Sequence, residues 1–270
     1  MGQCSLTVAL PILSACGLET AVLPSAVLST HTGGFSGWTF RDLTEDMPAI
    51  RAHWEREGLR FAAVYTGYLG SAAQIGHVLD IAASLCRPDG RLIVDPAMAD
   101  NGRLYAGFDE AFVAAMRPLT ASADFILPNI TEAALLSGMP FRERYDAAYI
   151  DALLRTVAAP GQTVVLTGVS FDAETTGVMV YRDGKTEYYR HRKLPAGCHG
   201  TGDVFASAFT GALLGGRSPI DAARIAADFV VACMERTLRD EGHWYGVEFE
   251  PELPGLLRAL RRGESGAKTE

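Results

Sequence analysis

One stretch decides the fold of this chain: Ala196-Gly197-Cys198-His199-Gly200-Thr201-Gly202-Asp203-Val204-Phe205-Ala206-Ser207-Ala208-Phe209. Glycines flank Thr201, and the small and apolar residues after Asp203 predict a buried helix that runs to Leu214. A glycine-rich turn that opens a helix leaves backbone N–H groups without partners, and the helix dipole favours negative charge there, so the turn predicts an anion site. Asp203 either charges the first helical turn or acts as a proton acceptor beside a reacting group, and the local pattern leaves both interpretations open.

The chain has 270 residues, of which 48% are hydrophobic and 21% charged, as is ordinary for a globular protein with a full core. A net charge of −8, with no run of Lys or Arg, gives no support for a nucleic-acid partner. No apolar stretch reaches the ~18 to 20 residues needed to cross a bilayer, and the N-terminus lacks the features of a signal peptide. The five scattered cysteines indicate reduced thiols. We therefore expect a cytoplasmic protein with a small-molecule partner and no membrane association.

The order of periodic segments predicts one three-layer α/β domain over residues 1–270, with a doubly wound, mostly parallel sheet and helices on both faces. Buried strands are expected at 61–65, 91–94, 125–127 and 163–166, and helices at 42–57, 71–85, 109–119 and 146–157. Asp183-Gly184, between β-rich runs at 177–182 and 186–191, predicts an antiparallel hairpin late in the chain. Besides the helix expected after Asp203, later helices are expected at 218–235 and 251–262, and residues 263–270 are expected to form a flexible tail.

The chain begins on a helix instead of a strand. Ser5 is expected to cap a helix that ends near Cys16-Gly17, and a strand is expected at Thr20 to Leu23. A crossover helix in an α/β fold needs a parallel strand before it and another after it. Because this chain begins at the helix, the strand that should precede it is expected to be missing. Pro88-Asp89-Gly90 is expected to form a turn.

Polar residues follow three predicted strands, at the edge where open parallel sheets bind their ligands. They are Asp95 with Asp100, then Asn129 with Thr131 and Glu132, and finally Thr167. These residues also have structural interpretations. Asp95-Pro96 could simply start a turn, and Thr131 could be the N-cap of a helix with Glu132 in its first turn. The loop at 29–38 is rich in glycine and aromatic residues, and it either holds a ligand or is a plain connector. Since these segments share one edge of the sheet, we interpret them together as a binding site.

Several catalytic schemes are excluded because their motifs are missing. The sequence has no Walker loop, no H-E-x-x-H, no G-x-S-x-G and no G-x-G-x-x-G, since Phe205 stands where the third glycine of that last motif belongs. An anion-binding helix start with an adjacent carboxylate remains. That set suits phosphoryl transfer by a kinase without a Walker loop, in which N–H groups and Mg²⁺ neutralise the phosphates and an aspartate takes the proton of the acceptor alcohol.

The turn Gly200-Thr201-Gly202-Asp203 resembles the C-terminal signature of the ribokinase superfamily. Further segments occur in the order seen in its pyridoxal kinases, so the resemblance spans nearly the whole chain. These segments are Ser5 to Pro11, Leu28 to Gly34, Thr66-Gly67-Tyr68, Asp95-Pro96 with Asp100, Pro128-Asn129 with Glu132, and Thr167-Gly168.

The resemblance implies ATP-dependent phosphorylation of the 5′-hydroxyl of pyridoxal, pyridoxine or pyridoxamine, in salvage of pyridoxal 5′-phosphate. It implies that Asp203 is the general base and that Gly200, Thr201 and Gly202 form the anion hole. Asp95 and Glu132 would lie on the Mg²⁺ and phosphate side, with Asp100, Asn129 and Thr167 around the nucleotide. His31, Thr32 and Tyr68 match positions that close on the pyridine ring of the B6 vitamer.

Two departures from the family pattern matter. Pyridoxal kinases begin with a strand and a polar turn that contributes to the vitamin site, and Met1 stands just after that point. Leu127 occupies a place where relatives often have a hydroxyl residue near a monovalent cation, so binding of that ion is left open, as is a homodimer. The alternatives are a hydroxymethylpyrimidine kinase, which usually has Gly-Thr-Gly-Cys where this chain has Asp203, and an N-terminally truncated protein that binds vitamer or nucleotide without turnover.

Overall fold

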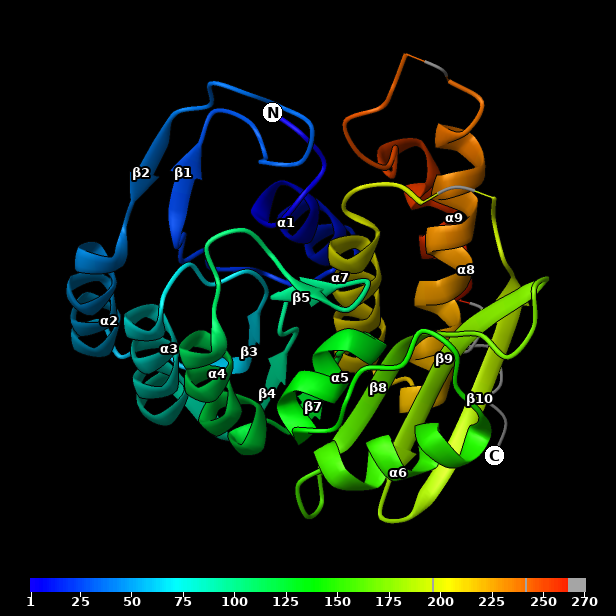
Figure 1. The fold of residues 1–270 in the computed structure, drawn as a ribbon. Helices are drawn as coiled ribbons and strands as arrows, with labels where there is room; N and C mark the ends of the chain where they lie inside the picture. The colour runs from blue at the N-terminus through cyan, green and yellow to red at the C-terminus, as the bar shows by residue number, and fades with distance from the viewer. Residues whose placement is uncertain (196, 241, 262–270) are drawn as a thin grey trace, which may run out of the picture. The chain divides into compact units, whose positions relative to one another are not determined.

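The computed structural model of the chain describes residues 1–195, 197–240 and 242–261 (Figure 1). They form two compact units. The first unit comprises Met1–Val22, Leu28–Phe40 and Tyr189–Glu270, and the second unit comprises Leu23–Val27 and Arg41–Tyr188. A single domain over 1–270 stays a prediction, and the predicted tail at 263–270 lies outside the described residues.

The second unit is built on a six-stranded sheet in the order β10-β9-β8-β7-β4-β3. Neighbouring strands are parallel from β3 to β8, and β9 pairs antiparallel with β8. Asp183 and Gly184 join β9 to β10 with φ of 49° and 81°, the left-handed values of the hairpin turn that Asp-Gly predicts. The predicted hairpin is therefore confirmed. The strands are β3 (Phe61–Thr66), β4 (Cys86–Val94), β7 (Phe125–Ile126), β8 (Thr163–Val169), β9 (Thr175–Arg182) and β10 (Lys185–Arg192), the last of which runs on into the first unit.

Helices of the second unit pack together and against this sheet, and apolar side chains from both form one buried core. Ser71, Asp109 and Asp146 each cap a helix by accepting a hydrogen bond from a backbone N–H of the first turn. Side chains such as Ile126 and Met116 are fully buried where strand and helix meet. The helices are α2 (Met47–Arg56, after a 3₁₀ turn at Thr44–Asp46), α3 (Ala72–Leu85), α4 (Glu110–Ser122), α5 (Ile130–Ser137) and α6 (Ala147–Val157).

Two short ribbons carry loops outside the main sheet. β1 (Ala26–Leu28) pairs with β2 (Phe40–Asp42) at the base of the loop at 29–39. β5 (Ala99–Asp100) pairs antiparallel with β6 (Arg103–Leu104) through Asn101 and Gly102, whose φ values are 50° and 75°. Asn-Gly is a strong hairpin signal, so this second ribbon could have been predicted from the sequence.

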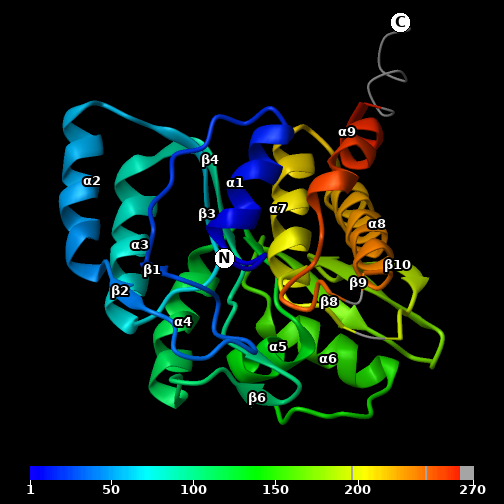
Figure 2. The ribbon, with the colours of Figure 1, turned by 90° about the horizontal axis from the view of Figure 1, so that it is seen from above.

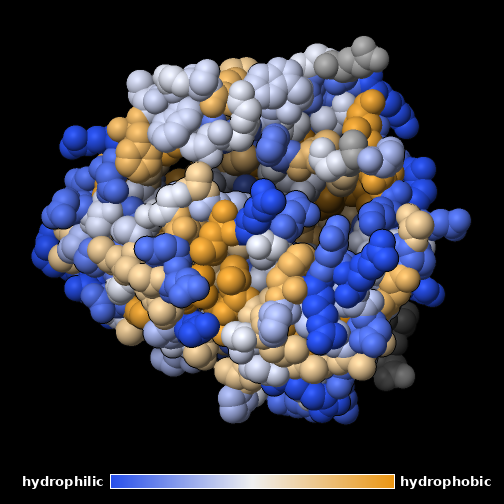
Figure 3. All heavy atoms as spheres, in the orientation of Figure 1, coloured by the Kyte–Doolittle hydropathy of each residue, from blue (hydrophilic) through white to orange (hydrophobic). Residues whose placement is uncertain are grey.

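The first unit is helical. It contains α1 (Leu6–Ala15), α7 (Thr201–Leu214), α8 (Pro219–Thr237) and α9 (Leu253–Arg261), and α7 lies between α1 and α8 (Figure 2). Gly211 allows the close approach of α1 to α7, because a Cβ atom there would lie only 2.4 Å from Cys16 Sγ. Each helix with a described position is too short or too polar to span a bilayer. On the face drawn in Figure 3, hydrophobic residues reach the surface in patches that hydrophilic residues separate.

Three local predictions were wrong. Residues 18–24 form no strand, because an extended segment becomes one only when a neighbour pairs with it, and no described residue does so. Pro88 to Gly90 continue β4, opposite a shift of register between Phe61 and Ala63. Ser5 precedes α1, but its side chain makes no capping hydrogen bond.

Candidate active site

The Gly-Thr-Gly turn opens α7 in the first unit. Gly200 is the N-cap with a φ of 82°, and a Cβ atom there would lie 1.8 Å from the carbonyl oxygen of Gln3, so only glycine fits. Thr201 Oγ1 donates to the carbonyl of Cys198 at 3.3 Å. No side chain within the described part of the chain caps the helix. The N–H groups of its first turn are therefore available to an anion.

Asp203 stands in the first turn of α7, against the segment that leads into α1. Burial raises the pKa of its carboxyl group, and a hydrogen bond from the backbone N–H of Ser5 partly opposes that rise. Burial and the nearby Asp203 charge together raise the pKa of the Cys4 thiol to about 12. Ser5 has φ 52° and ψ −129°, a conformation that favours glycine. A half-buried carboxyl group with a raised pKa is a better proton acceptor than an exposed one.

The loop after β1 belongs to the same unit and is held by hydrogen bonds and ring contacts. His31 Nδ1 accepts a hydrogen bond from the N–H of Gly33 at 3.0 Å, so its proton lies on Nε2, which donates to the carbonyl of Tyr245 at 2.6 Å. Phe35 packs on His31 edge to face, with ring centroids 5.0 Å apart, and on Trp244 at 4.7 Å. Both ring nitrogens of His31 are thus engaged within the protein, and the neighbouring Thr32 is exposed.

In the second unit, Asp95 follows β4 and is only 8% exposed. Its N–H donates to the carbonyl of Thr66 at the end of β3, at 3.0 Å, and its Oδ1 accepts from the N–H of Ala97 at 3.1 Å. The Asp-Pro turn predicted as the structural alternative is therefore present. Tyr68, two residues beyond β3, is 40% exposed and stacks on Phe108 with centroids 5.4 Å apart.

Glu132 is 3% exposed and holds two backbone segments together. Its Oε1 accepts from the N–H groups of Met98 at 2.9 Å and Ala99 at 3.4 Å, and its Oε2 accepts from the N–H of Asn129 at 3.0 Å. Burial outweighs these three hydrogen bonds and raises the pKa of Glu132 to about 7, and the charge of Asp100 adds to the rise.

Asn129, and not Thr131 as predicted, is the N-cap of α5. Its Oδ1 accepts from the N–H of Glu132 at 2.9 Å, which completes a capping box, and its Nδ2 donates to the carbonyl of Ala99 at 2.7 Å. Thr131 Oγ1 instead accepts from the N–H of Gly102 in the β5–β6 turn, at 3.0 Å. Asn129 forms a parallel bridge with Thr167, whose N–H donates to the carbonyl of Pro128 at 3.0 Å.

The second unit therefore brings five predicted residues to one place: Asp95, Asp100, Asn129, Glu132 and Thr167. The first unit brings the Gly-Thr-Gly turn next to Asp203 and, separately, fixes His31 beside Thr32. Reasoning from the sequence missed Ser5, whose backbone conformation carries no sequence signal. It also left His199 without a role.

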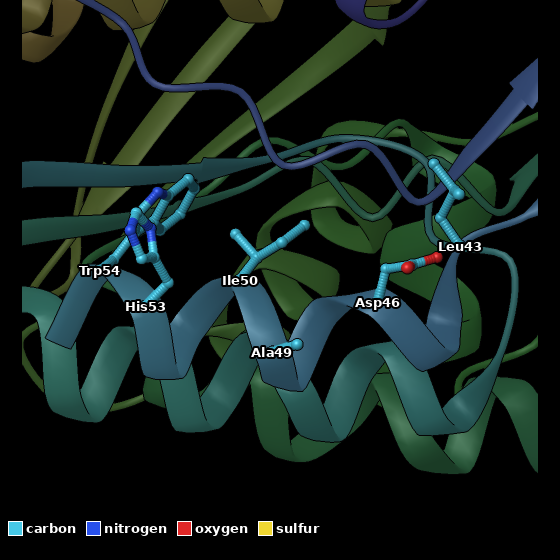
Figure 4. Close-up of a pocket in the computed structure, with 6 residues that line it drawn as sticks. All are labelled: Leu43, Asp46, Ala49, Ile50, His53 and Trp54. Carbon is cyan, nitrogen blue, oxygen red and sulfur yellow. The ribbon is translucent and has the colours of Figure 1, made fainter. Parts of the chain in front are cut away.

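Two other features lie apart from these residues. A hollow of about 510 Å³ runs along α2 and the segment before it. The lining residues drawn in Figure 4 are Leu43 and Asp46, which precede the helix, and Ala49, Ile50, His53 and Trp54, which belong to it. The hollow includes no predicted site residue. In the first unit, Asp240, His243 and Glu248 cluster, but Arg236 Nε lies 3.9 Å from Glu248 Oε2 and already supplies a positive charge there.

Comparison with known proteins identifies the family. The profile of the phosphomethylpyrimidine kinase family matches residues 14–247. The pyridoxine/pyridoxal/pyridoxamine kinase of Bordetella bronchiseptica is 31% identical over 87% of this chain and 85% of its own length. The pyridoxal kinase of Lactobacillus plantarum superposes with a TM-score of 0.89 and 33% identity, over 97% of this chain and 94% of that one.

A Bacteroides thetaiotaomicron protein, provisionally assigned as a phosphomethylpyrimidine kinase and crystallised with pyridoxal, superposes with a TM-score of 0.87 and 38% identity, over 97% of this chain and 92% of that one. These likenesses confirm the predicted ribokinase-like α/β class. The chain belongs to the phosphomethylpyrimidine kinase family, in the ribokinase-like superfamily that includes the pyridoxal kinases.

Proposed function

We infer that this chain is a pyridoxal kinase, which transfers the γ-phosphoryl group of ATP to the 5′-hydroxyl of pyridoxal, pyridoxine or pyridoxamine. One observation carries the inference: an uncapped glycine-rich helix start stands directly before a carboxyl group whose pKa burial raises. The relatives described above, which are kinases of B6 vitamers, give the substrate class.

In the proposed mechanism Asp203 takes the proton of the 5′-hydroxyl. The alcohol oxygen then attacks the γ-phosphorus, the bond from that phosphorus to the β,γ-bridging oxygen breaks, and ADP leaves. Backbone N–H groups of Gly200, Thr201 and Gly202 stabilise the negative charge on the transferred phosphoryl group. The raised pKa of Asp203 suits this role, because a base with a raised pKa takes a proton more readily.

Asp95 and Glu132 fit a magnesium ion by their chemistry, since carboxylate oxygens are the ligands that Mg²⁺ prefers. We propose that Asp95 and Glu132 would hold the ion, and both oxygens of Glu132 also accept backbone N–H groups, which fix its carboxylate in place. When bound, Mg²⁺ would neutralise phosphate charge.

The remaining assignments follow the predicted roles. We propose that Asp100, Asn129 and Thr167 contact the nucleotide, and that Thr32 and Tyr68 contact the vitamin. His31 has no unbonded ring nitrogen, so its proposed contact with the vitamin uses the face or edge of the ring.

A hydroxymethylpyrimidine kinase is the second candidate, because the matching family profile is that of the phosphomethylpyrimidine kinases. Asp203 argues for the B6 vitamers, since the pyrimidine kinases usually have cysteine at this position. The relative from Bacteroides thetaiotaomicron also favours them, because it was crystallised with pyridoxal.

The test is a direct assay of the purified chain with ATP and Mg²⁺. Pyridoxal, pyridoxine, pyridoxamine and hydroxymethylpyrimidine are supplied separately, and ADP and the phosphorylated product are both measured. We expect turnover of at least one B6 vitamer to exceed turnover of the pyrimidine. Faster turnover of the pyrimidine would replace the substrate assignment, and vitamer binding without ADP formation would establish a binding protein instead.

A further inference from the structure

His199 stands directly before the Gly200-Thr201-Gly202 turn, and its backbone is fixed. Its carbonyl oxygen accepts a hydrogen bond from the N–H of Val247 at 3.0 Å. The residue is nevertheless exposed, so its ring lies at the surface of the first unit. An exposed aromatic ring on a fixed backbone beside an anion-binding turn is well placed to influence what binds there.

The ring of His199 packs on Gly33 in the loop after β1. A Cβ atom at Gly33 would lie 3.0 Å from His199 Cε1, 3.2 Å from Nδ1 and 3.4 Å from Nε2. Three ring atoms at nearly equal distances mean that the position a Cβ atom would take at Gly33 lies over the face of the imidazole, near Cε1. Gly33 has no left-handed φ, so its backbone conformation does not require glycine. The lack of a side chain there is explained by the contact with His199.

The loop on the other side of this contact is held by hydrogen bonds of its own. His31, whose ring centroid lies 5.4 Å from that of His199, is held by the N–H of Gly33 and the carbonyl of Tyr245. Thr32 lies between His31 and Gly33 in the chain, so its backbone position is set by the same contacts. The ring of His199 thus joins the turn that carries Thr32 to the turn that opens α7.

We propose that His199 is a positioning residue whose flat ring, packed on Gly33, sets the spacing between the vitamin-binding turn at Thr32 and the phosphate-binding turn at Gly200 to Gly202. The proposal rests on the function proposed above. It matters because an error of about 1 Å between reacting groups costs up to roughly 100-fold in rate.

The test is a double-mutant cycle between Gly33→Ala and His199→Ala, with Gly197→Ala as the matched control. Gly197 lies in the same loop as His199, has no left-handed φ, and a Cβ atom there would meet nothing within 4 Å. We expect Gly33→Ala alone to raise the KM for the vitamer about 3- to 10-fold and to leave the KM for ATP unchanged, since the contact lies on the vitamin side. In the His199→Ala background most of that effect should vanish, because the ring that the new methyl group meets is gone.

Two further variants separate a flat spacer from a hydrogen-bonding group. His199→Phe keeps a ring of similar shape without its nitrogens, and we expect it to retain a near-normal KM for the vitamer. His199→Asn keeps hydrogen bonding without the ring and should resemble His199→Ala. Strictly additive effects in the cycle, or full activity of His199→Asn with loss in His199→Phe, would overturn the proposal.

The same cycle is also measured without turnover, through the dissociation constant of pyridoxal and the free energy of unfolding of each variant. If the chain phosphorylates no vitamer, coupling in these two quantities still tests the contact and its link to the vitamin site. Coupling in stability with no change in pyridoxal binding in any variant would reduce His199 to a structural residue and reject the positioning role.

Discussion

The backbone N–H of Ser5 donates a hydrogen bond to the carboxylate of Asp203, and Cys4, one residue earlier, lies within reach of the same negative charge. The segment that enters α1 therefore forms one wall around the proposed general base. That wall raises the pKa of Asp203 by excluding water, while the single N–H bond limits the rise and fixes the orientation of the carboxylate. The environment of the base is thus set by residues about 200 positions away in the sequence.

Replacement of Asp203 by Asn should lower kcat by 10² or more and leave nucleotide binding largely intact, as expected for loss of a general base. The matched control is Asp221→Asn, because Asp221 also stands third in its helix, α8, but is exposed there. It tests the alternative that an aspartate at this helical position only charges the first turn. Equal losses in the two variants, or near-normal turnover of Asp203→Asn, would remove Asp203 from the catalytic role.

The raised pKa of Asp203 also predicts how kcat/KM depends on pH. The base must be ionised to accept a proton, so kcat/KM should fall as the pH drops through a pKa above the usual range for aspartate. A profile of kcat/KM against pH, measured on the wild-type chain, gives the pKa of this base. An acidic limb at an ordinary aspartate pKa would contradict the influence of burial.

Replacement of Ser5 by Gly should raise the free energy of unfolding by about 1 kcal/mol. The strain of a non-glycine residue at φ 52° and ψ −129° costs about 1 to 3 kcal/mol, and the greater flexibility of glycine in the unfolded chain offsets about 0.5 to 1 kcal/mol of the gain. Ser5→Ala should change stability by less than about 0.5 kcal/mol, because the Ser5 side chain makes no capping bond. Urea unfolding measures both, and a loss of 1 kcal/mol or more in Ser5→Ala would indicate a cap after all.

Local signals predicted the elements that local interactions determine. The helices predicted from Ser71 and Asp146 are present, each capped by that residue, and Asp183-Gly184 turns the predicted hairpin, because in each case the deciding contact lies within a few residues. Thr20 to Leu23 failed for the opposite reason, since a strand depends on a distant neighbour. The cap of α5 fell between these cases, because both Asn129 and Thr131 suit an N-cap and only the contact of Thr131 with Gly102 decides between them.

The candidate site shows the same division. Its polar residues could be predicted because they follow strands whose ends share an edge, and the family resemblance gave each a role. The hydrogen bonds and the burial of those residues could not be predicted. The double engagement of His31 depends on Tyr245, and the burial of Glu132 depends on the backbone of Met98, both far away in the sequence.

Glu132 should make stability depend on pH. Its pKa is raised in the folded state to about 7 from a usual value near 4.5, so the folded state binds a proton that the unfolded state releases. Its contribution to the free energy of unfolding is therefore fully present below about pH 4.5 and is lost as the pH rises through about 7.

Urea unfolding of the wild-type chain and Glu132→Gln between pH 5 and 8 measures this contribution. The free energy of unfolding of the wild-type chain should fall relative to that of Glu132→Gln as the pH rises, because only the carboxyl group titrates. Glu110→Gln, at an exposed position in the first turn of α4, is the control and should show no such trend. A wild-type stability that rises relative to that of Glu132→Gln with increasing pH would mean that the backbone hydrogen bonds, and not burial, dominate at Glu132.

The two glycines of the anion turn should respond in opposite ways to replacement by alanine. Gly200→Ala should destabilise the fold by more than about 3 kcal/mol, because its φ is 82° and its new Cβ atom would lie 1.8 Å from the Gln3 carbonyl oxygen. Gly202→Ala meets nothing within 4 Å and adds a good helix former to α7, so its stability should be equal or higher. A methyl group there would nevertheless crowd the N–H groups that face the phosphate, and kcat/KM should fall about 10-fold or more while the fold persists. Thermal unfolding and kinetics of the two variants side by side separate these effects, and full activity of Gly202→Ala would mean that the phosphate does not approach the helix at this residue.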